Sequence, residues 1–92
     1  MPTNPVWPIA DSDSVARAFE DAAGSLDSVD GEVTFELSAV PRVDARGLRA
    51  METLAKAAQE RKVKVALHGV NVGVYKALKL MGLTRSFQFV NS

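Results

Sequence analysis

The sequence predicts a single globular domain with an α/β fold, built on a mostly parallel β-sheet of about four strands, and three observations support this. Segments with the alternating apolar pattern of strands are separated by segments with helical spacing, in the order β-α-β-α-β-α-β. The 92 residues are enough for one domain with one core, so we expect residues 1–92 to form a single domain. Hydrophobic residues make up 47% and charged residues 24%, which is typical of a globular protein.

The first half of the chain predicts a strand, a helix and a second strand. Residues 6–9 form a short strand that Pro8 restricts to a sheet edge, because proline donates no ladder hydrogen bond. Asp11–Asp13 supplies N-cap residues for a helix, and Gly24 weakens the last turn of that helix. The apolar stripe of this helix is Val15, Phe19, Ala22, Ala23 and Leu26. Residues 33–37 alternate as a strand with one face on the core.

A loop, residues 38–44, then leads into a second helix. Asp44 is its N-cap, and Arg61 and Lys62 lie at its negative end. Its apolar residues at helical spacing are Leu48, Met51, Leu54, Ala55 and Ala58. The next alternating segment, residues 63–67, predicts a third strand.

The C-terminal part predicts a third helix and a fourth strand. Gly69 turns the chain, Asn71 is the N-cap and Gly82 ends the helix as its C′ residue. The apolar positions of this helix are Val74, Ala77, Leu78 and Met81. Residues 87–90 form the last short strand.

Composition and motifs argue against catalysis and against metal or cofactor binding. The chain has no cysteine, so disulfides, zinc ribbons, iron–sulfur sites and thiol nucleophiles are excluded. The single histidine, His68, lacks further ligands at metal-binding spacing, and we interpret it as a strand-end side chain. Gly69–Gly73 resembles a fragment of a phosphate turn but lacks a third glycine, so we interpret it as a tight turn before a helix. We expect no catalytic residue, no metal and no cofactor.

Charge and hydropathy restrict the partners. Eleven basic residues balance eleven acidic ones, so electrostatic binding of nucleic acid is not expected. No apolar run approaches the roughly 20 residues that cross a bilayer, and the N-terminal residues lack the pattern of a secretory signal. We therefore expect a cytoplasmic protein that does not insert into membranes.

The segment Pro41–Arg49 is the least conventional part of the sequence. Arg42 precedes the second helix, and Arg46 and Arg49 lie in its first turns, where positive charge opposes the helix dipole at about 0.3–1 kcal/mol each. A local rule broken in this way points to function or strain. Two interpretations stay open: a docking surface for an acidic partner or an anion, and three well-solvated arginines.

Several segments taken in order resemble a STAS domain, the module of sulfate-transporter tails and bacterial anti-sigma factor antagonists. These segments are Phe35–Val40, Val43–Leu48, Val63–Val70, Val74–Leu83 and Phe87. The resemblance implies a mixed, mostly parallel sheet with helices packed mainly on one side. It also implies a regulatory role through contact with another protein.

The resemblance draws attention to Ala45. In anti-sigma factor antagonists the segment that matches Asp44–Gly47 presents a phosphorylatable serine or threonine, and its phosphate breaks the contact with an anti-sigma factor kinase. Alanine has no hydroxyl, so this position cannot accept a phosphoryl group. We expect a non-catalytic regulatory adaptor, similar to an anti-sigma factor antagonist, whose partner contact is constitutive or never used this switch.

The expected contact residues surround the start of the second helix. They are Arg42, Asp44, Ala45, Arg46, Gly47, Arg49 and Thr53. We expect Ala50 to be exposed beside them, and we assign the stripe of Leu48, Met51 and Leu54 to the core because the sheet needs a cover.

Other functions and partners stay open. The sequence is also similar to the small STAS subunit of the bacterial phospholipid-transport ABC complex, which docks on the ABC ATPase. A STAS module that senses an anion or a nucleotide is a further alternative. An uncovered sheet edge predicts contact with a partner or with a second copy of the chain, giving a homodimer.

Overall fold

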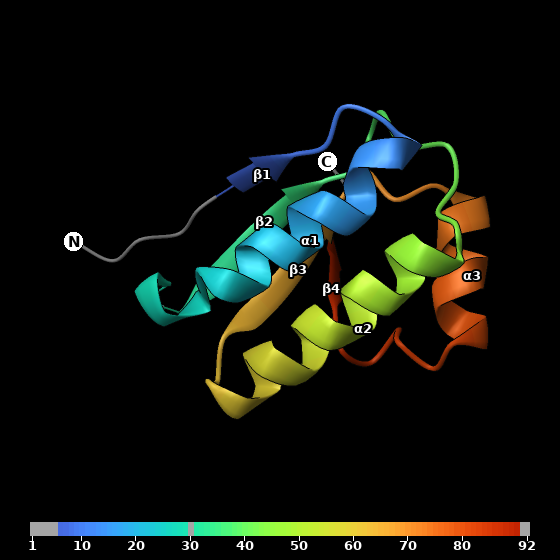
Figure 1. The fold of residues 1–92 in the computed structure, drawn as a ribbon. Coiled ribbons are helices and arrows are strands. Elements are labelled where there is room, and N and C mark those ends of the chain that lie inside the picture. The colour runs from blue at the N-terminus through green and yellow to red at the C-terminus, as the bar shows by residue number, and fades with distance from the viewer. Residues whose placement is uncertain (1–5, 30, 91–92) are drawn as a thin grey trace.

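The structure, a computed structural model, describes residues 6–29 and 31–90, in which strands and helices alternate as predicted (Figure 1). The strands are β1 (Val6–Pro8), β2 (Glu32–Glu36), β3 (Lys64–His68) and β4 (Gln88–Val90). The helices are α1 (Val15–Gly24), α2 (Ala45–Glu60) and α3 (Val72–Leu80). Single 3₁₀ turns, η1 (Ser12–Ser14) and η2 (Leu26–Ser28), flank α1.

The four strands form one sheet in the order β1-β2-β3-β4, and each of the three pairings is parallel. The mostly parallel α/β fold is therefore confirmed. As Pro8 predicts, β1 lies at an edge, and the β4 strand forms the other edge of the sheet that the described residues build. Each of the first three strands leads into a helix and then into its parallel neighbour, which is the connection that parallel pairing requires.

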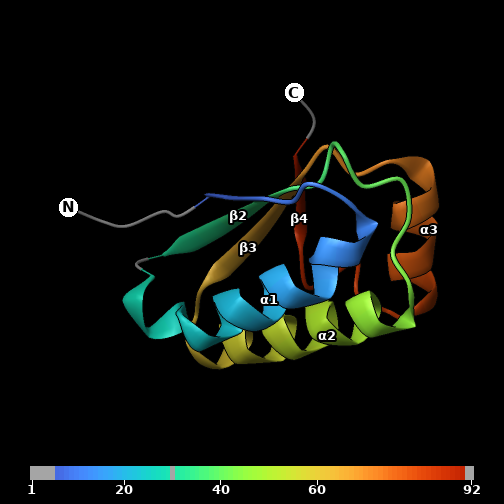
Figure 2. The same ribbon diagram turned by 45° about the horizontal axis from the view of Figure 1, so that its top comes forward.

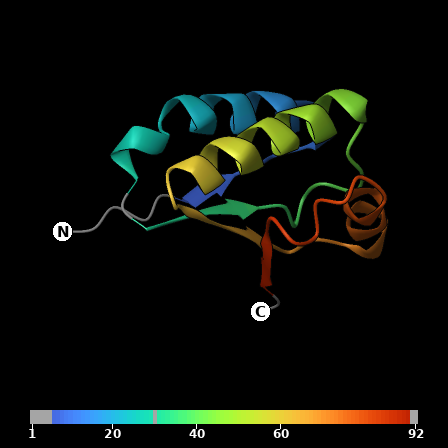
Figure 3. The same ribbon diagram turned by 90° about the horizontal axis from the view of Figure 1, so that it is seen from below.

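The helices pack on one face of the sheet. One register row crosses all four strands and therefore shares a face: Trp7, Phe35, Leu67 and Phe89. Phe19 of α1 stacks on Phe35 with ring centroids 3.9 Å apart, and Tyr75 of α3 meets Phe89 edge-on at 5.1 Å. Figures 2 and 3 show α1 and α2 side by side over the sheet and α3 beyond them near β4.

The core fills the space between this face and the helices. The largest fully buried side chains include Phe19, Phe35, Leu26, Leu37, Met51, Leu54, Leu67 and Leu78. The assignment of Met51 and Leu54 to the core is thus confirmed, and Leu48 is half-buried. The expectation that Ala50 is exposed is wrong. Gly47 and Ala50 are three residues apart and share one side of α2, and this side is buried with Gly47 against Val15 of α1.

Among residues 6–29 and 31–90, no helix covers the opposite face of the sheet (Figure 3). Alternation along the strands turns Thr34, Glu36, His68, Gln88 and Val90 to this face, and all five are exposed or half-buried. Ala66 is the one strand residue there that is buried. At the carboxyl ends of β2 and β3 this open face meets the loops that lead into α2 and α3, where functional groups of parallel sheets gather.

Candidate functional site

The start of α2 is fixed by a side-chain cap. Asp44 has extended backbone angles, and its carboxylate accepts a hydrogen bond from the Gly47 N–H at 2.8 Å. This satisfies one of the free N–H groups at the helix end. Ala45 is therefore the first helical residue and Arg46 the second, and both are exposed.

Six of the seven contact residues expected from the sequence are exposed, and the seventh, Gly47, is buried. Arg46, Arg49 and Thr53 follow spacings of three and four residues, which places them on one side of α2, and Arg42 is exposed in the preceding loop. We call Arg42, Asp44, Ala45, Arg46, Arg49 and Thr53 the α2 surface. Within residues 6–29 and 31–90, none of its arginines has an ion-pair partner.

Gly47 lies beneath the α2 surface and has a packing role. It is buried, and a Cβ at this position would lie 2.7 Å from Cγ1 of Val43 and 3.2 Å from Cγ1 of Val15. A larger side chain would therefore push α2 away from α1. Gly47 supports the exposed residues around it without being exposed itself.

A polar cavity of about 360 Å³ lies between the starts of α1 and α2. Its lining residues are Ser12, Asp13, Ala16, Arg17, Asp44 and Arg46. The Oγ atom of Ser12 is buried and has no hydrogen-bond partner among the described residues. Two arginines face two aspartates here, so the cavity has nearly balanced charge.

The loop before α2 is fastened to the start of α3. Asn71 accepts a hydrogen bond from the Val74 N–H at 2.8 Å and thereby caps α3. Its side-chain amide also donates to the carbonyl oxygens of Val40 and Pro41, at 3.2 and 3.0 Å. One side chain therefore positions both α3 and the loop that carries Arg42.

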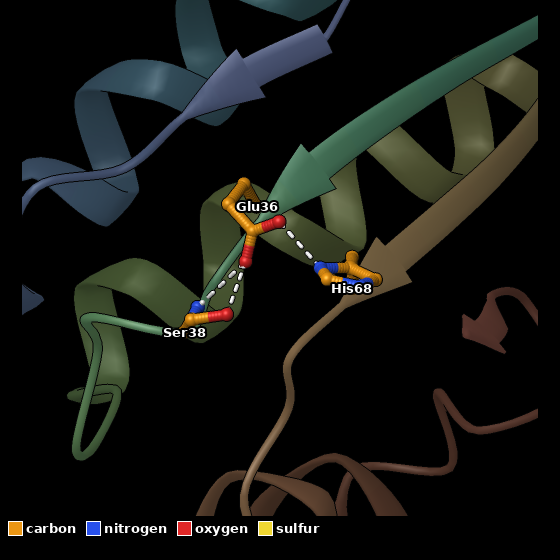
Figure 4. A network of polar contacts seen from close by, with 3 residues as sticks. All are labelled: Glu36, Ser38 and His68. Carbon is orange, nitrogen blue, oxygen red and sulfur yellow. Dashed lines mark hydrogen bonds and ion pairs between the residues drawn. The ribbon is translucent and has the colours of Figure 1, made fainter. Parts of the chain in front are cut away.

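A second polar group, which sequence reasoning missed, lies on the open face (Figure 4). Ser38 donates to Oε1 of Glu36 through its hydroxyl and, at 3.1 Å, through its backbone N–H, while Oε2 of Glu36 pairs with Nδ1 of His68. The hydrogen bond from the Ser38 hydroxyl is the main cause of a lowered pKa of Glu36, with smaller contributions from the Ser38 N–H and His68, and partial burial opposes the change.

Gly69 is needed for the close approach of these loops. Its φ of +76° lies in the left-handed region, and a Cβ there would crowd Oγ of Ser38 and lie 2.9 Å from the Ser38 backbone nitrogen. The signal for this contact was present in the sequence as a glycine directly after the β3 strand, but the sequence does not show which residue approaches it.

The Glu36 network does not have the order of a hydrolytic triad. In such a triad the histidine contacts the serine hydroxyl, whereas here the carboxylate lies between the two. The network instead joins the β2–α2 loop to the end of β3.

Within the described part of the chain, no group of three or more His, Asp or Glu side chains is placed to hold a metal ion. None of the helices described is both long and apolar enough to cross a membrane.

Comparisons with known proteins agree with the fold. Similar solved structures include a SulP transporter STAS domain from Vibrio cholerae, at 21% identity and TM-score 0.74, covering 99% of this chain and 77% of that one. A sulfate transporter family protein from Wolinella succinogenes has 21% identity and TM-score 0.74, with coverage of 92% and 75%. A candidate anti-sigma factor antagonist from Thermotoga maritima has 20% identity and TM-score 0.64, with coverage of 97% and 74%.

Identities near 20% show a shared fold and no more. The comparison with curated proteins found no match. The model of the STAS domain family, however, matches residues 10–92, which is most of the sequence. The chain therefore belongs to the STAS domain family.

Proposed function

We propose that this protein is a non-catalytic regulatory adaptor of the cytoplasm that binds one protein partner through the α2 surface, in the manner of an anti-sigma factor antagonist. The observation that carries the proposal is the group of three exposed arginines around an N-terminal helix turn whose family phosphoacceptor position is Ala45. Without a hydroxyl at Ala45, phosphate cannot be added there to break the contact. The partner contact is therefore constitutive with respect to this switch.

Charge favours a protein partner over a free anion. The cavity beside Arg46 is lined by Arg17 and Arg46 but also by Asp13 and Asp44, so it offers little net attraction to phosphate or a nucleotide. The exposed arginines on the rim suit carboxylates of an acidic protein surface, where charge complementarity raises association rates. Anion sensing is the weaker alternative.

Two partner classes fit the adaptor role. One is an anti-sigma factor of the kinase type, and the other is the ATPase of an ABC lipid transporter. Affinity purification of the tagged chain from its native cells, followed by mass spectrometry, distinguishes them by the identity of the partner.

The test of the surface is charge reversal at Arg46. Arg46→Glu is expected to lower partner recovery by about tenfold or more, because the new carboxylate repels an acidic partner. The fold should stay intact because Arg46 is exposed. Arg85→Glu is the matched control: it makes the same change at an exposed residue just before β4, at the opposite end of the sheet. Recovery of the same partner at wild-type yield by Arg46→Glu would contradict the proposal.

A homodimer through a sheet edge is part of the same proposal. The outer edge of β1 is three residues long and contains Pro8, so a dimer through this edge rests on few backbone hydrogen bonds and is weak. Light scattering at tens of micromolar protein, about the range in which weak dimers form, tests this point. A strictly monomeric species would remove the self-association.

A further inference from the structure

Charge is divided unevenly along the chain. All eleven acidic residues lie at or before Glu60, whereas six of the eleven basic residues follow it. Residues 61–90, which build β3, α3 and β4, therefore carry no acidic side chain. Figure 1 shows α3 at the end of the molecule remote from β1, and the charged side chains of this helix, Lys76 and Lys79, are both basic.

Helix α3 turns a mixed apolar and basic stripe toward solvent. The stripe consists of Val72, Tyr75, Lys76, Lys79 and Leu80, all of them exposed. Their spacing of i, i+3, i+4, i+7 and i+8 places them on one side of the helix. Val74 and Leu78 on the inner side are buried and already anchor α3 to the core. Apart from Tyr75, whose ring meets Phe89 edge-on, the α3 stripe is therefore not needed to hold the helix on the core.

Exposed apolar side chains concentrate in this part of the molecule. Among the described residues six large hydrophobic side chains are exposed, and five of them lie between positions 72 and 90: Val72, Tyr75, Leu80, Met81 and Val90. Leu80 is 89% exposed and Val72 is 68% exposed. Apolar surface gathered in this way marks an interaction site.

We propose that the α3 stripe docks on the surface of an anionic lipid bilayer, with α3 lying along the membrane plane. Leu80 and Val72 enter the headgroup region, and Lys76 and Lys79 contact lipid phosphates, each lysine adding about fivefold to the affinity. Nine residues of helix are too short to span a bilayer, so the contact is peripheral.

The charge pattern favours a bilayer over a protein. Protein interfaces are usually matched by charges of both signs, which fix the register of the partner. A uniformly anionic surface needs only positive charge, and residues 61–90 offer only that. The stripe also extends about 12 Å along the helix. A flat surface can therefore contact Val72 at one end of the stripe and Leu80 at the other end at the same time.

Vesicle sedimentation tests the proposal. The full chain is mixed with vesicles of phosphatidylcholine alone or with about a quarter of phosphatidylglycerol, at about 1 mM lipid. We expect binding only to the anionic vesicles, and release at high salt, which screens the lysines. Lys76→Glu with Lys79→Glu should weaken binding at least tenfold, and Leu80→Ser should weaken it several-fold.

The matched control is Arg17→Glu with Lys56→Glu, which makes the same change of net charge at exposed residues of α1 and α2. This control should bind like the wild type. Absence of binding to anionic vesicles, or equal loss in both double variants, overturns the proposal. Binding to soluble poly-glutamate as tight as to vesicles, with Leu80→Ser without effect, also overturns it and assigns the stripe to an acidic protein. Leu80→Ser keeps the test decisive if the lysine variant misfolds.

Discussion

The carboxylate of Glu36 joins two loops at the carboxyl end of the sheet. One oxygen accepts from Ser38 at the start of the loop to α2, and the other pairs with His68 at the end of β3. The loop that carries Arg42 and leads into α2 is thereby held at its first residues by Glu36 and near its middle by Asn71. Such support keeps the exposed residues of a loop in one geometry.

Gly69 makes this junction possible, and comparison with Gly82 isolates its contribution. Both residues have positive φ, +76° and +72°, but a Cβ at Gly82 meets nothing within 4 Å, whereas one at Gly69 lies 2.9 Å from the Ser38 nitrogen. Gly82→Ala should cost about 1 kcal/mol of unfolding free energy from backbone strain alone. Gly69→Ala should cost about 2–3 kcal/mol because the loop must also move. Urea unfolding measures both, and equal costs would contradict the close approach.

The helix ends show which features a sequence reveals. Asp44, Asn71 and Gly82 were predicted as cap residues and are confirmed, because capping depends on residues within one turn. The C-terminal end of α2 was harder to predict: Lys62 adopts φ of +57° there without the glycine that usually marks this conformation.

Contacts between distant segments were missed for a physical reason. The pairing of Glu36 with His68 joins residues on two strands, and it depends on the register of β2 against β3. Apolar periodicity predicts each strand separately but does not set that register. The exposure of Ala50 was predicted wrongly for a related reason. Helix α1 packs beside α2 and buries residues that do not face the sheet, and the apolar periodicity of α2 does not show where α1 lies.

The side-chain caps Asp44 and Asn71 make different numbers of hydrogen bonds, so their removal should lower the free energy of unfolding by different amounts. Asp44→Ala loses the bond to the Gly47 N–H and should lower the free energy of unfolding by about 1 kcal/mol. Asn71→Ala also loses the bonds to the Val40 and Pro41 carbonyls and should cost about 2 kcal/mol. Thermal and urea unfolding measure the difference. Equal costs would mean that Asn71 does not fasten the loop.

At the scale of the whole fold, the described helices cover one face of the sheet and leave the other face uncovered (Figure 3). Parallel sheets are usually covered on both faces, so the whole apolar core here lies between a single helical layer and the strands. The α2 surface and the α3 stripe lie on the outer sides of this layer, where Asp44 caps α2 and Tyr75 meets Phe89. Substitutions of the other residues of the two surfaces are therefore expected to leave the fold intact.

Stability should accordingly depend on the centre of the single core and much less on its rim. Phe19 is fully buried and stacks on Phe35, which in turn stacks on Trp7 at a centroid distance of 6.4 Å. Phe19→Ala should cost about 3–5 kcal/mol, a large part of the 5–15 kcal/mol typical of a domain. Phe89→Ala at the half-buried rim should cost about half as much.

Trp7 is the only tryptophan and contacts this aromatic stack, so its fluorescence during urea unfolding reports both variants. Because the described helices form a single layer, a cavity at Phe19 should loosen α1, β2 and β1 together, and the transition should stay cooperative while its midpoint falls. Equal midpoint shifts for Phe19→Ala and Phe89→Ala would show that burial at the centre of the sheet does not dominate the stability of this one-sided fold.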